Sequence, residues 1–129
     1  MRLGDKIGRQ TMVNILIADD EDIVRYALRK ILERTGHSVF EARDGVEALS
    51  ILASHAVDVA VVDMIMPNKE GVETTIEIRR KYPTIKIIAI SGGGRSHNFD
   101  FLEYAQKFGA HTSLHKPFTD KQLLESISP

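Results

Sequence analysis

The chain has 129 residues, 43% of them hydrophobic and 27% charged, a composition that predicts one compact globular domain. It contains no cysteine, which excludes disulfides, thiolate metal sites and cysteine nucleophiles. A formal net charge of −1 provides no basic field for direct nucleic-acid binding by this chain. No apolar run is long enough to cross a membrane and no secretory signal begins the chain, so we expect a cytoplasmic protein without a membrane role.

Strand-like segments recur along the chain from Met12, after a polar and aperiodic stretch at residues 1–11 that we expect to be a tail. These segments are short and rich in Val and Ile, which is typical of strands buried on both faces of a sheet. The predicted strands span residues 12–18, 38–42, 57–62, 85–90 and 112–115.

Apolar residues at helical spacing follow each predicted strand. Gly36 and Gly109 are expected to end two of these helices, and Thr119 is expected to cap the last one. The predicted apolar stripes consist of Val24, Ala27, Leu28, Ile31 and Leu32; Val46, Ala48, Leu49 and Leu52; Val72, Ile76 and Ile78; Phe99, Leu102, Ala105 and Phe108; and Leu123, Leu124 and Ile127.

The alternation of strands and helices predicts one α/β domain over residues 12–129, built on a five-stranded parallel sheet that is doubly wound. Helices would cover both faces of this sheet. Ligands of such domains gather outside the carboxyl ends of the strands, near the point where the strand order reverses. Functional residues are therefore expected where the strands end.

Polar residues stand at four of these strand ends: Asp19 and Asp20, then Asp63, Ser91 and Lys116. Three carboxylates at one edge repel one another unless they share protons, separate or bind a cation. Hard oxygen ligands without thiols favour Mg²⁺ over zinc. A carboxylate beside such a cation can attack a phosphoryl group, while a lysine and a hydroxyl contact the phosphoryl oxygens.

Each of these residues also has a simpler interpretation. Asp19 or Asp20 can cap the helix that follows, and Asp63 can begin a loop. Lys116 can be an exposed charge, and Ser91 can belong to a turn. These interpretations are reasonable one at a time, but together they require four strand ends to carry these residue types by accident.

The same residues lie within short segments whose order and spacing are distinctive: residues 15–21 (ILIADDE), residues 63–67 (DMIMP), Gly71, Ser91-Gly92, Gly109-Ala110 and residues 116–118 (KPF). These segments resemble those of response-regulator receiver domains, the phosphoacceptor modules of two-component signalling and phosphorelays. The resemblance covers nearly everything from Val13 to Ile127. It implies a flavodoxin-like (βα)5 fold, similar to that of chemotaxis regulators, with strand order 2-1-3-4-5.

The resemblance also implies a role for each residue. Asp63 would be the phosphoacceptor, Ser91 would contact the phosphoryl group and Lys116 would pair with it. The ligands of Mg²⁺ would be Asp19, Asp20, Asp63 and the backbone carbonyl of Ile65.

The partners implied by the resemblance are proteins. The phosphodonor would be a sensor histidine kinase or a histidine phosphotransfer protein, and the phosphorylated chain would change its contact with a downstream protein target. A homodimer is a further possible assembly. The chain would assist only its own phosphorylation and dephosphorylation, without acting as a turnover enzyme.

Two features depart from the family pattern. Ser113 stands where receiver domains commonly carry Tyr or Phe, so a large ring cannot move there as a switch. Residues 91–95 are rich in glycine, and we expect this loop to rearrange when Asp63 is modified.

Phe101 and Tyr104 fall outside the predicted buried stripe of their helix. Contact with a partner and packing on a neighbouring loop explain these two rings equally well.

Other functions are less well supported by the residues. A receiver-like module that binds proteins without phosphorylation is the main alternative. A phosphatase with an aspartate nucleophile would need a second acid where Ile65 stands. His111 and His115 have a spacing that binds zinc on a helix, but their segment is predicted to be a strand. The other histidines, His37, His55 and His97, are expected to be solvated.

The chain ends directly after its last predicted helix, so we expect either a stand-alone receiver or a piece of a longer regulator.

Overall fold

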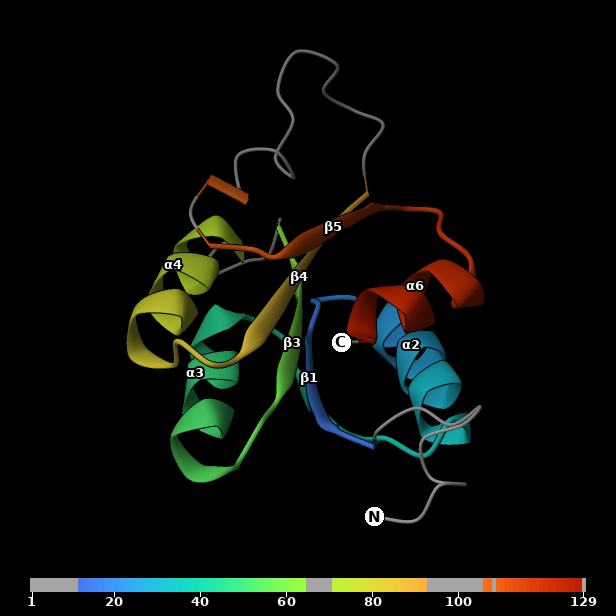
Figure 1. The fold of residues 1–129 in the computed structure, drawn as a ribbon, viewed down its shortest axis with the longest axis horizontal. Helices are drawn as coiled ribbons and strands as arrows, with labels where there is room; N and C mark the ends of the chain where they lie inside the picture. The colour runs from blue at the N-terminus through green and yellow to red at the C-terminus, as the bar shows by residue number, and fades with distance from the viewer. Residues whose placement is uncertain (1–11, 65–70, 93–105, 108, 129) are drawn as a thin grey trace.

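The computed structural model describes residues 12–64, 71–92, 106–107 and 109–128 (Figure 1). The tail predicted for residues 1–11 and the apolar stripe predicted between Phe99 and Phe108 lie outside the described residues. Ile65, His97, Phe101, Tyr104 and most of the glycine-rich loop also lie outside them.

The described strands form one parallel sheet with the order β2-β1-β3-β4-β5, which confirms the predicted fold class. Asn14 pairs with Ser38, so β1 begins two residues later than predicted because its partner β2 begins there. The strands are β1 (Asn14–Ala18), β2 (Ser38–Ala42), β3 (Val59–Asp63), β4 (Lys86–Ser91) and β5 (Thr112–His115).

Helices cover both faces of the sheet: α2 and α6 lie on one face, and α3 and α4 lie on the other (Figure 1). Gly36 follows α2 with φ 94°, a conformation that glycine adopts without strain. Thr119 caps α6 as predicted, since its side chain accepts from the backbone N–H of Gln122 and the Gln122 side chain accepts from the N–H of Thr119. The helices are α2 (Asp22–Arg34), α3 (Gly45–Ser54), α4 (Gly71–Lys81) and α6 (Asp120–Ile127).

The buried faces of the helices differ from the predicted stripes at particular positions. In α2, Ala27 is exposed and Arg25 is buried in its place, beside Leu28 and Leu32. In α3, Val46 is exposed. The stripe predicted for α4 is wrong at Ile76, which is exposed; the buried positions of this helix are Gly71, Thr74, Thr75 and Ile78.

The prediction that His37 is solvated is wrong, because this side chain is buried. Its Nδ1 accepts a hydrogen bond from the backbone N–H of Val13 at 3.1 Å, which holds the chain at the start of β1. Burial lowers the pKa of His37, so the imidazole is neutral as this hydrogen bond requires. His55 is exposed as predicted, with its ring against Phe40.

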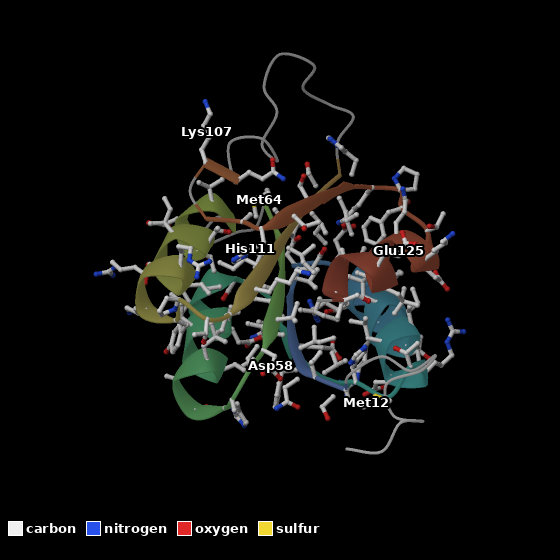
Figure 2. The ribbon with its side chains drawn as sticks, viewed as in Figure 1. Met12, Asp58, Met64, Lys107, His111 and Glu125 are labelled. Atoms are coloured by element: carbon white, nitrogen blue, oxygen red, sulfur yellow. The ribbon has the colours of Figure 1, made fainter. Side chains whose placement is uncertain are left out.

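Side chains fill the space on each side of the sheet, and β3 is buried along its whole length (Figure 2). Asp58 precedes β3 and Met64 follows it, so the two residues lie at opposite ends of this strand (Figure 2). The buried central strands thus carry Asp63 to the carboxyl edge of the sheet and hold it there.

Candidate functional site: an acidic cluster at the carboxyl edge of the sheet

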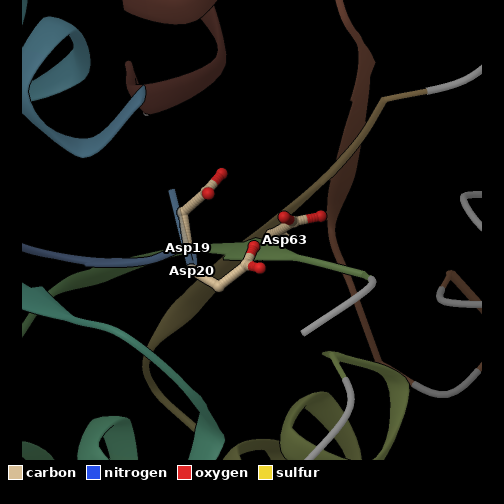
Figure 3. A group of neighbouring side chains, drawn as sticks. All are labelled: Asp19, Asp20 and Asp63. Carbon is tan, nitrogen blue, oxygen red and sulfur yellow. The ribbon is translucent and has the colours of Figure 1, made fainter. Parts of the chain in front are cut away.

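The acidic residues predicted to converge do lie together. One carboxylate oxygen from each of Asp19, Asp20 and Asp63 lies within 4.8 Å of the others. Asp19 and Asp20 directly follow β1, and Asp63 is the last residue of the neighbouring strand β3. Figure 3 shows the carboxylate of Asp20 turned toward that of Asp63, with Asp19 beside them.

Asp19 is fully buried and every polar group it carries has a partner. Its Oδ1 accepts from the backbone N–H of Glu21 at 2.9 Å, and its Oδ2 lies 3.1 Å from Lys116 Nζ. Its own N–H donates to the carbonyl of Ala42 at 3.1 Å, and its carbonyl accepts from Arg25 Nη1 at 2.7 Å. Asp20 is exposed, so the cluster joins a buried carboxylate to one that solvent can reach.

Lys116 brings a positive charge to the cluster from the end of β5. Its Nζ lies 3.1 Å from Asp19 Oδ2 and 3.9 Å from both Asp63 Oδ2 and Glu21 Oε1. Burial by itself lowers the pKa of Lys116, but the charges of Asp63 and Asp19 outweigh this and hold its pKa above the ordinary value. The ammonium is therefore charged beside the buried acids.

Backbone contacts fix the strand ends that carry these side chains. The N–H of Lys116 donates to the carbonyl of Ser91 at 2.7 Å, and the N–H of Met64 donates to the carbonyl of Ile90 at 2.9 Å. Ser91 is buried at the end of β4, which places it at the same edge as Asp63. The predicted site residues of four strands thus share one edge of the sheet.

The donor set of the cluster fits a hard divalent cation. It consists of carboxylate oxygens alone, with no sulfur or imidazole among them, and such oxygens are the ligands that Mg²⁺ prefers. Lys116 lies beside Asp19 and Asp63, and a cation bound among the three carboxylates would lower their mutual repulsion. Ile65, whose backbone carbonyl the family resemblance implies as a further ligand, lies outside the described residues.

The histidine pair considered for zinc has another arrangement. His111 and His115 flank and end the strand β5, as predicted. His111 Nδ1 accepts from the backbone N–H of Ile87 at 3.0 Å, and its Nε2 lies 2.8 Å from Arg79 Nη1. Within the described part of the chain, the group of acidic, histidine and cysteine side chains close enough to hold a metal is Asp19, Asp20 and Asp63.

Ser113 lies on β5 and is half-buried, with its hydroxyl accepting from Gln106 Nε2 at 3.3 Å. The usual aromatic ring of the family is thus replaced by a small hydrogen-bonding group.

The sequence patterns missed Arg25, which touches the backbone of Asp19. A signal was present, since Arg25 lies three residues before Leu28 and therefore on the same helix face as the buried leucines. A charged residue in an apolar stripe indicates a buried partner.

Comparison with known proteins places this arrangement in a family. The response regulator receiver domain model matches residues 15–128. Chemotaxis protein CheY of Halobacterium salinarum is 32% identical over 114 residues, which cover 88% of this chain and 92% of that protein. The crystal structure of a response regulator receiver domain protein from Clostridium thermocellum has a TM-score of 0.82 and 31% identity, covering 90% of this chain and 91% of that one.

The chain belongs to the response-regulator receiver domain family. It is a receiver domain of the kind found in two-component response regulators, and receiver domains are phosphoacceptor switches. Longer proteins also contain the match: sensor kinase CckA of Brucella abortus is 37% identical over 115 residues, and these are only 12% of that protein. No described helix of this chain is both long and apolar enough to span a membrane.

Proposed function

We propose that Asp63 accepts a phosphoryl group and that Asp19, Asp20 and Asp63, together with the carbonyl of Ile65, hold the Mg²⁺ that this reaction needs. The convergence of three carboxylates and Lys116 at one sheet edge carries this proposal. When bound, Mg²⁺ neutralises the acids and clamps phosphoryl oxygens. A module that works without phosphorylation would not need this cluster, and the family membership does not favour it.

In the proposed reaction, a carboxylate oxygen of Asp63 attacks the phosphorus atom of the donor. The bond from phosphorus to the leaving group breaks, and its electron pair leaves with the donor. The product is an acyl phosphate on Asp63. Lys116 Nζ lies 3.9 Å from Asp63 Oδ2 and supplies positive charge to the phosphoryl oxygens, while Ser91 contacts them at the same edge.

The proposal extends to partners and setting. The phosphodonor is a sensor histidine kinase or a histidine phosphotransfer protein, and the phosphorylated chain changes its contact with a downstream protein target in the cytoplasm. The chain assists only its own phosphorylation and dephosphorylation. A homodimer and the boundary at residue 12 stay predictions from the sequence.

The test is intact-mass spectrometry after incubation with acetyl phosphate, with and without Mg²⁺. We expect one phosphoryl adduct that depends on Mg²⁺ and is absent from Asp63→Asn. Asp58→Asn is the matched control, because Asp58 is an aspartate at the opposite end of β3 and should leave the adduct unchanged (Figure 2). A wild-type protein that binds Mg²⁺ yet forms no adduct, and does not bind beryllofluoride, would overturn the proposal.

A further inference from the structure

Arg25 is a buried arginine that the chemistry above does not use. Its side chain is 9% exposed, although α2 has an exposed face available. Burying a guanidinium is costly unless each of its nitrogens finds an acceptor. The acceptors it has found therefore indicate what it does.

The three nitrogens of Arg25 reach three different residues. Nε donates to Glu41 Oε1 on β2 at 3.0 Å, and Nη2 pairs with Asp22 in the first turn of α2. Nη1 donates to the backbone carbonyl of Asp19 at 2.7 Å. Two nitrogens of the planar guanidinium thus contact carboxylates, and the third donates to the backbone directly after β1.

The carbonyl that accepts this hydrogen bond from Arg25 belongs to the peptide unit between Asp19 and Asp20. Rotation of that unit would change the direction in which the Asp20 side chain leaves the backbone. The N–H of Asp19 already donates to Ala42, so the contact with Arg25 fixes the other end of the residue. Asp20 is exposed, and its backbone is held on both sides: Arg25 contacts the peptide unit before it, and the N–H of the peptide unit after it, that of Glu21, donates to Asp19 Oδ1 at 2.9 Å.

We propose that Arg25 is a positioning residue for the acidic cluster, which sets the affinity for Mg²⁺ by fixing the Asp19–Asp20 peptide unit. The inference rests on the proposed function, because it assumes that the cluster binds Mg²⁺. Groups that orient metal ligands typically change metal affinity by about 10- to 100-fold when they are removed.

The sign of the effect separates positioning from simple charge. Arg25 is a cation whose Nη1 lies 2.7 Å from the backbone carbonyl of Asp19, a residue of the acidic cluster, so removing its charge should by electrostatics alone tighten the binding of another cation. Loss of positioning has the opposite result. Arg25→Met, which lacks both the charge and the donors, should therefore bind Mg²⁺ more weakly if Arg25 positions the cluster and more tightly if it acts only as a charge.

Arg29 offers a matched control on the same helix. Its Nη1 donates to the other oxygen of Glu41 at 2.7 Å and its Nε to Glu33 at 2.9 Å. It therefore shares a partner with Arg25 but has no contact with Asp19 or Asp20 among those given by the structure. Arg29→Met makes the same chemical change without touching the peptide unit.

The experiment is calorimetric titration of the intact chain with Mg²⁺ alone, on wild type, Arg25→Met, Arg25→Lys and Arg29→Met, each first shown to melt cooperatively. We expect a Kd about tenfold or more higher for Arg25→Met, a smaller increase for Arg25→Lys and no change for Arg29→Met. If Arg25→Met does not fold, Arg25→Lys decides the question, because it keeps the charge and loses the fork. Adduct formation with acetyl phosphate should recover at saturating Mg²⁺, which general damage to the fold would not allow.

Two different failures can be told apart. If wild type binds Mg²⁺ and the Arg25 variants bind it as tightly as Arg29→Met or more tightly, the positioning role is overturned and the proposed function stands. If wild type itself binds no Mg²⁺, both fall together.

Discussion

Thr75 buries a hydroxyl that has no hydrogen-bond partner in the part of the chain that the structure describes. An unsatisfied buried hydroxyl costs free energy, and valine has the same shape without it. We expect Thr75→Val to raise the free energy of unfolding by about 1 kcal/mol in urea denaturation. Thr74 is buried to the same extent and is not left without a partner. Thr74→Val should therefore not stabilise, and equal stabilisation by both variants would contradict this explanation.

His37 should make stability depend on pH. Burial lowers the pKa of His37 in the folded state. As the pH falls through about 6.5, the imidazole is therefore protonated in the unfolded chain before it is protonated in the folded chain. Its stabilising effect is complete above about pH 6.5 and is lost as the pH falls from there through the lower folded-state pKa. The measurement is the free energy of unfolding between pH 7.5 and 5, chosen to bracket the usual histidine range of about 6.5.

His37→Asn should flatten that pH profile, because asparagine keeps an acceptor for the Val13 N–H and does not titrate. His55→Asn is the control of the same type at an exposed position. A profile of the same slope in His37→Asn and wild type would show that other groups cause the loss of stability in acid.

Helix α4 begins in very close contact with the strand end that carries Asp63. A Cβ built on Gly71 would lie 2.1 Å from the carbonyl oxygen of Asp63 and 2.4 Å from the Cα of Met64. Both contacts are with backbone, which cannot turn aside as a side chain can. Gly71 is therefore required so that α4 can approach β3.

Gly71→Ala should lower the free energy of unfolding by about 2 kcal/mol, since it forces either the helix or the strand end to shift. It should also slow adduct formation on Asp63, because the acceptor is attached to the displaced backbone. Gly92→Ala is the matched control, since a Cβ there meets nothing within 4 Å. Equal melting temperatures for the two variants would contradict the steric explanation.

The helices show where periodicity alone misleads. Strands β2 and β5 begin and end as predicted because each is a short run bounded by turn residues. The apolar pattern of α4, in contrast, includes Ile76, which is exposed, and omits Thr74 and Thr75, which are buried. Apolar residues at helical spacing allow several neighbouring stripes, and only the direction in which a helix packs selects one of them.

The chain as a whole carries a repulsive cluster in its folded state, and this predicts a linkage between Mg²⁺ and stability. A ligand that binds only the folded chain stabilises it by about 2.7 kcal/mol at a concentration of 100 times its Kd. We expect Mg²⁺ to raise the melting temperature of wild type measured by circular dichroism. Asp20→Asn should melt at a higher temperature than wild type without Mg²⁺, because one repelling charge is gone, and should lose the response to Mg²⁺.

An equal rise with Mg²⁺ in wild type and Asp20→Asn would contradict this linkage. A monovalent salt at matched ionic strength controls for general screening.

The linear pattern of the chain determined the fold class, the positions of its strands and the strand ends where functional residues stand. Parallel strands bring their carboxyl ends to one edge, so Asp19, Asp63 and Lys116 could be predicted to meet before any distance was known. The tertiary structure alone decided how they meet. Asp19 and Lys116 are 97 residues apart in sequence, and their 3.1 Å contact depends on the packing of every element between them.

The contacts of Arg25 are also a feature that only the tertiary structure decided. Its role depends on Glu41, which lies on β2, and on the backbone carbonyl of Asp19, which directly follows β1. Periodicity describes which residues share a face of one element, whereas hydrogen-bond geometry depends on distances between elements. That is why the composition of the site could be predicted from local patterns, and why the contacts of the arginine that supports it emerged only from the folded chain.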